Sequence, residues 1–124
     1  MGLDEFIRRF EAGSLTKEEW THAAHLRMAA WYVSRFSVEE AGVRIRVGIR
    51  HLNECLGGEN TEDAGFHETL TEFWICEVRA HMAVHGDDLE RLCALPAGLW
   101  KRDYCSELPK DRRARREYVK PGEA

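Results

Sequence analysis

Apolar side chains recur every three to four residues in four segments of the chain, and polar or glycine-rich stretches separate these segments. The first segment covers residues 3–12 and ends at Gly13, and the second runs from residue 17 to about residue 35. The third covers residues 38–56, and the fourth runs from about residue 66 to residue 85. The spacing has the period of an α-helix, so each segment is predicted to be an amphipathic helix.

Two of these helices have clear start signals. Thr16 is followed three residues later by Glu19, and Ser37 is followed three residues later by Glu40. Both pairs match the capping box, in which each side chain bonds to the backbone N–H of the other residue. The second segment is apolar, aromatic or histidine over most of its circumference. We therefore expect it to be the central and most buried helix.

The remainder of the chain predicts shorter helical pieces. Cap and turn residues indicate one piece over residues 87–95, and further pieces near 99–105 and 110–116. No stretch of useful length alternates apolar and polar residues as a half-buried strand does. The prediction is an all-α fold, a compact bundle of three long helices plus several short ones. Residues 1–120 would form a single domain, with 121–124 as a loose C-terminal tail.

Charge is distributed unevenly along the chain. The formal net charge is −4, whereas residues 101–120 hold eight basic and four acidic side chains. No aromatic platform is interleaved with the arginines as it is in many nucleic-acid binding segments. We therefore predict a basic segment that folds back on an acidic body, and the pattern disfavours nucleic acid as a partner.

Four cysteines occur without any CxxC pair, which argues against a zinc site made of cysteines. The N-terminal residues are acidic and lack the apolar stretch of a signal peptide. No segment approaches the ~20 apolar residues that cross a bilayer, so no membrane association is expected. Free thiols together with these features predict a cytoplasmic protein.

Two histidine-containing groups are candidates for a functional site. His22 and His25 are three residues apart and therefore share one side of a helix. His67 and Glu68 begin the fourth helical segment. If the first turns of these two helices meet, three imidazoles and one carboxylate would converge at the rim of the bundle.

Neutral imidazole is the commonest metal ligand, and three donors with an open position are typical of a catalytic metal site. The hypothesis is that His22, His25 and His67 bind a divalent metal such as Zn, Fe or Mn. Glu68 would be a fourth ligand or a general base, and without a metal His67 and Glu68 would be the acid–base pair. Side chains predicted to shape a small-molecule pocket around this site are Trp20, Tyr32, Asn53 and Trp74.

Another interpretation stays open at this point. The histidines near the helix starts could be structural residues whose hydrogen bonds are satisfied within the fold. The protein would then be a non-catalytic interaction or regulatory module, with an exposed apolar patch and a homodimer or complex in solution.

Three motifs resemble a family of small bacterial proteins of uncharacterised function. They are W-x-H-x-x-H-L at residues 20–26, R-I-R-x-G-I at 44–49 followed by Asn53, and (Y/F)-H-E-T-x-T-x-x-W at 66–74. The resemblance covers about residues 5–120. It implies a bacterial source and a shared site at the positions of the three histidines and the glutamate, but no reaction.

The chain departs from that family pattern at three positions. Phe66 stands where tyrosine is common, Tyr118 where tryptophan is common, and Gly122 where aspartate is common. A role of a phenol hydroxyl at position 66 would be lost here. The three histidines are also loosely similar to those of metal-binding helical bundles of the DinB type, an analogy at the level of the fold.

Overall fold

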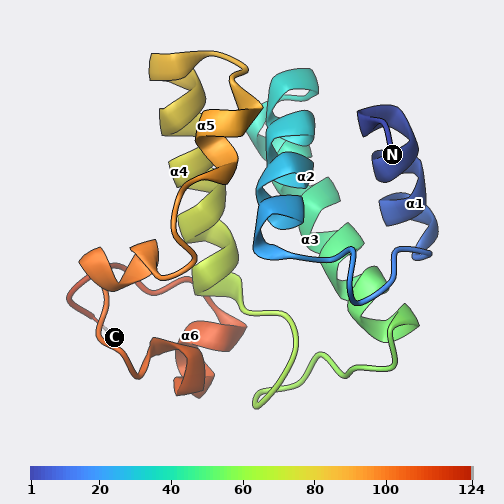
Figure 1. Ribbon diagram of the computed structural model, residues 1–124. Coiled ribbons are helices and arrows are strands. Elements are labelled where there is room, and N and C mark those ends of the chain that lie inside the picture. The colour runs from blue at the N-terminus through green and yellow to red at the C-terminus, as the bar shows by residue number, and fades with distance from the viewer. Residues whose placement is uncertain (124) are drawn as a thin grey trace.

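The computed structural model describes residues 1–123, and every regular element in that range is helical (Figure 1). The all-α fold class is therefore confirmed. Within the described range, no helix combines the length and apolarity needed to cross a membrane. Residue 124, the end of the predicted C-terminal tail, lies outside the described residues. The elements are α1 Leu3–Ala12, α2 His22–Arg35, α3 Val38–Cys55, α4 Glu68–His85, α5 Leu89–Cys93, α6 Arg112–Arg116 and the 3₁₀ helices η1 Leu99–Arg102 and η2 Leu108–Lys110.

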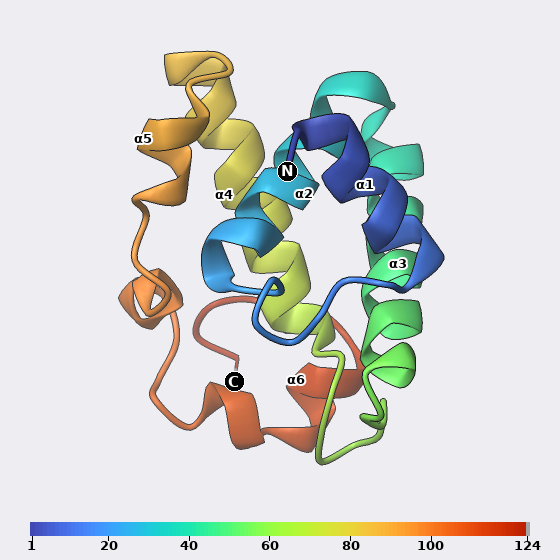
Figure 2. The ribbon, with the colours of Figure 1, turned by 45° about the vertical axis from the view of Figure 1, so that its right-hand side comes forward.

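Helix α2 lies at the centre of the bundle, as its apolar circumference predicts. It packs against α3, α4 and α5, while α1 packs on α3 and α6 packs on α4 (Figures 1 and 2). Six of its fourteen residues are buried, among them Leu26, Met28 and Tyr32. The space enclosed by α2, α3 and α4 is where the candidate site lies.

The number of long helices differs from the prediction. Four helices have ten residues or more, because α1 is a ten-residue helix that contributes to the core. Its side chains Phe6, Ile7 and Phe10 are at most 3% exposed. The bundle of three long helices is thus not confirmed in that detail.

The start of α2 also differs from the prediction. The capping box at Thr16 forms, with reciprocal bonds of 3.2 and 2.9 Å between Thr16 and Glu19, but it closes only a single turn. The chain then becomes extended at Thr21, whose hydroxyl caps α2 by accepting a bond from Ala24. Arg9 on α1 binds the Glu19 carboxylate with two bonds of 2.7 and 2.8 Å. The turn is therefore fastened to α1 instead of continuing into α2.

The C-terminal segment wraps around the first turns of α4 and forms a second apolar cluster there (Figure 2). Its basic residues fold back on acidic ones, as the charge pattern predicts. Arg112 pairs with Asp63 at 2.7 Å, and Arg116 lies 3.6 Å from Glu62 in the loop before α4. The buried members of the cluster are Phe73, Trp100, Tyr104, Leu108, Ala114 and Val119.

Candidate functional site

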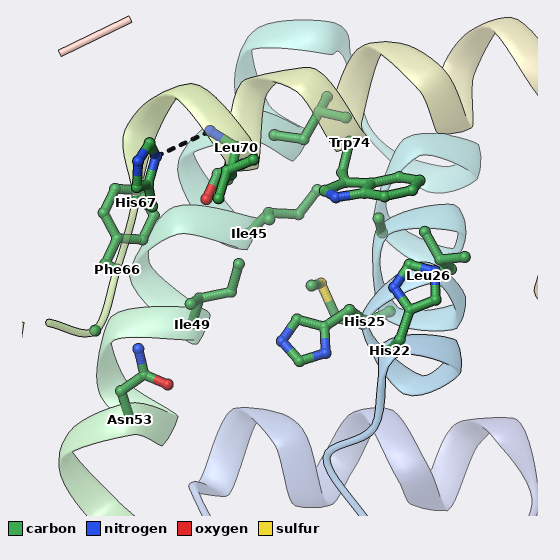
Figure 3. A pocket seen from close by; sticks show the side chains of 15 residues that line it. His22, His25, Leu26, Ile45, Ile49, Asn53, Phe66, His67, Leu70 and Trp74 are labelled. Carbon is green, nitrogen blue, oxygen red and sulfur yellow. Dashed lines mark hydrogen bonds between the residues drawn. The ribbon is translucent and has the colours of Figure 1, made fainter. Parts of the chain in front are cut away.

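A cavity of about 470 Å³ lies between α2, α3 and α4, and the loop that precedes α4 contributes to its wall. Apolar side chains make up most of the lining, with Trp74 as a flat aromatic wall (Figure 3). No acidic or basic side chain lines the cavity in the described part of the chain, apart from histidines. The polar side chains that line it are His22, His25, Asn53, His67 and Thr71.

His67 lines this cavity, but both of its ring nitrogens are already bound. The side chain caps α4, because its Nδ1 accepts a hydrogen bond of 3.1 Å from the backbone N–H of Leu70. A carbonyl oxygen can only accept, so the Nε2–H donates to the Leu108 carbonyl at 3.0 Å. His67 is 6% exposed and joins the start of α4 to the C-terminal segment. His67 therefore fits the interpretation in which the histidines are structural residues whose hydrogen bonds are satisfied within the fold.

His22 and His25 extend from the first turn of α2, and each ring has one nitrogen bound to a backbone carbonyl. The His25 Nδ1–H donates to the Thr21 carbonyl at 2.7 Å, and the His22 Nε2–H donates to the Leu95 carbonyl at 2.8 Å. The His25 ring also stacks on Trp20, with 3.7 Å between ring centroids. Each ring is thus held in one orientation while its second nitrogen stays available.

The predicted metal centre of His22, His25 and His67 is wrong in its geometry. The three residues line one cavity, but the His67 ring lies at one end beside Phe66 and the other two lie at the opposite end (Figure 3). His67 has no nitrogen left to bind a metal. Among residues 1–123, no three histidine, cysteine, aspartate or glutamate side chains are grouped closely enough to hold an ion.

Glu68 does not line the cavity, which removes the role predicted for it as a general base or fourth ligand. Its carboxylate accepts bonds of 2.9 Å from both Nε and Nη2 of Arg46 on α3. The same Nη2 donates to Glu72 one turn later, at 2.7 Å. Glu68 therefore ties α4 to α3 outside the cavity, and the acid–base pair of Glu68 with His67 is not formed.

The four side chains predicted to shape a ligand pocket divide into two pairs. Asn53 and Trp74 line the cavity, and their contact with a ligand stays a prediction. Trp20 lies behind His25, outside the cavity lining. Tyr32 is 1% exposed in the core, and its hydroxyl donates to Glu11 of α1 at 2.8 Å, so it lies away from the site.

Burial lowers the pKa of both His25 and His67 below the ordinary value of 6.5, because the charged ring loses its hydration. The unfolded chain thus takes up these protons at higher pH than the folded one. Stability is therefore at its full value above pH 6.5 and falls as the pH drops below that value. We expect urea unfolding between pH 7.5 and 5 to show this loss, with up to about 1.4 kcal/mol per pH unit for each histidine.

The variant His67→Asn tests the source of this pH dependence, because asparagine can still cap the helix but does not titrate. We expect a shallower decline in unfolding free energy on acidification than in the wild type. The matched control is His51→Gln, an exposed position at which the wild-type profile should persist. If unfolding free energy fell identically with pH in the wild type and both variants, His67 would not be a source of the pH dependence.

Several residues that build the site had no clear signal in the sequence. Asn60 lies in a loop for which the sequence predicts nothing beyond polar character. Its Oδ1 nevertheless accepts hydrogen bonds from the backbone N–H of Phe66 at 3.0 Å and from Nδ2 of Asn53 at 3.1 Å. Arg115 donates to the Gly65 carbonyl at 2.7 Å and so holds the same wall from the C-terminal side. Thr71 is the exception, because its spacing from His67 and Trp74 places all three side chains on one helix face, and all three line the cavity.

Comparisons with protein-family models, with curated proteins and with solved structures give no match to this chain. The resemblance to a small bacterial family, and the bacterial source that it implies, therefore stay predictions.

Proposed function

We propose that this protein binds a small, uncharged and mainly apolar molecule in the cavity between α2, α3 and α4. The observation that carries the proposal is the lining itself, which is apolar except for histidine, asparagine and threonine side chains. An ionic ligand would lose its hydration there without gaining a counter-charge. Because the four cysteines are free thiols, we place this function in a reducing compartment such as the cytoplasm.

The size of the cavity supports binding of a small molecule. Its volume of about 470 Å³ is within the range of roughly 300–1,000 Å³ that is usual for ligand sites. The cavity lies between the three longest helices and is partly open to solvent, so a small molecule can enter it without unfolding the bundle.

The wall of the cavity is also held in place before any ligand arrives. Asn60 binds both Asn53 and the backbone of Phe66, which joins the end of α3 to the loop before α4. Arg50 lies over the outer face of the Phe66 ring, 4.4 Å from its centroid. A wall that is already ordered reduces the entropy lost on binding.

Nuclear magnetic resonance with benzofuran as the probe tests the proposal. Benzofuran is apolar and uncharged, and we expect it to shift the methyl resonances of the aliphatic side chains that line the cavity. The variant Ile49→Trp fills part of the cavity and should abolish these shifts. Its matched control is Val47→Trp, a position on the same helix with 63% exposure, at which the shifts should persist.

The result that would overturn the proposal is an absence of shifts in the wild type, or shifts that Ile49→Trp leaves unchanged. The histidines would then be structural side chains, and the alternative of a protein-interaction module would be favoured.

A further inference from the structure

The hydrogen-bonding role of His25 toward the cavity is determined by its other contact. A carbonyl oxygen cannot donate, so the bond of 2.7 Å to Thr21 requires a hydrogen on Nδ1. Burial lowers the pKa of His25, and the ring is therefore neutral at pH 7 with a single hydrogen. Its Nε2 presents a bare lone pair on the side of the ring that faces α3 (Figure 3). The same reasoning makes Nδ1 of His22 an acceptor in the neutral ring, because its Nε2–H binds Leu95.

The role of Asn53 follows from its neighbour Asn60. A backbone N–H can only donate, so the Asn60 atom that Phe66 contacts at 3.0 Å is the amide oxygen. The same oxygen lies 3.1 Å from the Asn53 side chain, which must therefore direct its NH₂ group there. The Asn53 amide oxygen is left on the cavity side, turned toward His25 (Figure 3).

These assignments place a group of hydrogen-bond acceptors on His22, His25 and Asn53, whereas the Thr71 hydroxyl and the Trp74 Nε1–H, which also line the cavity, can donate. Two imidazole nitrogens and one amide oxygen offer lone pairs, and both nitrogens of His67 are already used. We infer that the cavity selects an uncharged molecule whose apolar body carries an O–H or N–H donor, directed at Nε2 of His25 and the amide oxygen of Asn53. Carboxylates and phosphates, which present only acceptors, find no hydrogen-bond donor in this group of lone pairs.

This inference rests on the proposed binding function and deepens it to a class of ligand. Indole and benzofuran provide the test, because they share size and shape but only indole has an N–H donor. We expect indole to bind about tenfold more tightly in calorimetric titration, since the missing donor leaves buried acceptors unpaired. Indole-2-carboxylate, which adds a negative charge, should bind more weakly than indole.

The variant His25→Phe keeps an aromatic ring against Trp20 but removes the acceptor. Its affinity for indole should fall to that for benzofuran, while the affinity for benzofuran stays as in the wild type. Should this variant fail to fold, the wild-type protein still gives an answer through its imidazole nitrogen resonances. Indole should shift the Nε2 resonance of His25, and benzofuran should not.

The possible failures can be told apart. Equal affinity for indole and benzofuran, or tighter binding of the carboxylate, would overturn the selection of donors and leave the cavity as a binding site. Binding of neither probe would overturn the proposed function and the ligand class together.

Discussion

Replacing Thr69 by valine is expected to lower the free energy of unfolding by about 3 kcal/mol, although the two side chains have nearly the same shape. Thr69 is fully buried in the first turn of α4. Its Oγ1 lies 2.7 Å from the Ala114 carbonyl and 3.0 Å from the Glu117 carbonyl, and it accepts a bond of 3.1 Å from the Val119 N–H. One hydroxyl thus serves three backbone groups of the C-terminal segment.

Valine would leave these backbone groups without a partner in a place that water does not reach easily. Each unsatisfied buried group costs about 1–3 kcal/mol, and the hydroxyl supplies one donor and accepts one bond. The C-terminal segment should loosen as a consequence, which would also release Arg115 from the Gly65 carbonyl. A weaker affinity of the cavity for benzofuran is therefore expected together with the loss of stability.

Urea unfolding of Thr69→Val and Thr71→Val measures this effect. The two positions carry the same substitution in the same helix, but the Thr71 hydroxyl makes no hydrogen bond to another residue in the range 1–123. Thr71→Val should therefore change the unfolding free energy by less than about 0.5 kcal/mol. Similar losses for the two variants would show that the backbone bonds of Thr69 contribute little.

The helices could be predicted from the sequence because their causes are local. Ser37 caps α3, and its Oγ accepts a bond of 3.1 Å from the Glu40 N–H, as the capping-box spacing predicts. The start of α2 could not be predicted in the same way. The capping box at Thr16 does form, but Arg9 binds Glu19 from another helix and Thr21 provides a second cap. Two valid start signals compete there, and contacts from α1 decide between them.

The cavity was predicted in part, because side chains on one helical face must share a space. His67 and Trp74 occupy one face of their segment and do line the same cavity. The role of His67 depends on Leu108, which is 41 residues away, and periodicity carries no information about that distance. The role of Glu68 also depends on a residue distant in the chain, because its partner Arg46 lies on α3. The residue types indicated that metal binding or acid–base chemistry was possible. Hydrogen-bond partners distant in the chain determine which side-chain atoms stay available to a ligand.

The second large effect is expected for Gly48→Ala, which should lower the free energy of unfolding by about 2 kcal/mol. In the interior of a helix, alanine ordinarily stabilises by about 0.5–1 kcal/mol relative to glycine. Here a Cβ atom would lie 2.4 Å from two ring carbons of Phe10, where α1 approaches α3. Phe10 is fully buried and packs against Trp20 and Tyr32, so its ring has little room to move. The steric conflict should therefore exceed the gain in helix propensity.

Gly42→Ala in the same helix is the matched control, with an expected change of the opposite sign. The nearest atom to its Cβ would be Nη1 of Arg46, at 2.7 Å. That atom is the end of a flexible side chain, and the bonds from Arg46 to Glu68 and Glu72 use Nε and Nη2 instead. Arg46 can thus shift at low cost, and a gain of about 0.5 kcal/mol is expected. If urea unfolding showed both alanines to be stabilising, α1 would not be held against α3 at Gly48, and the packing of the N-terminal helix would have to be reconsidered.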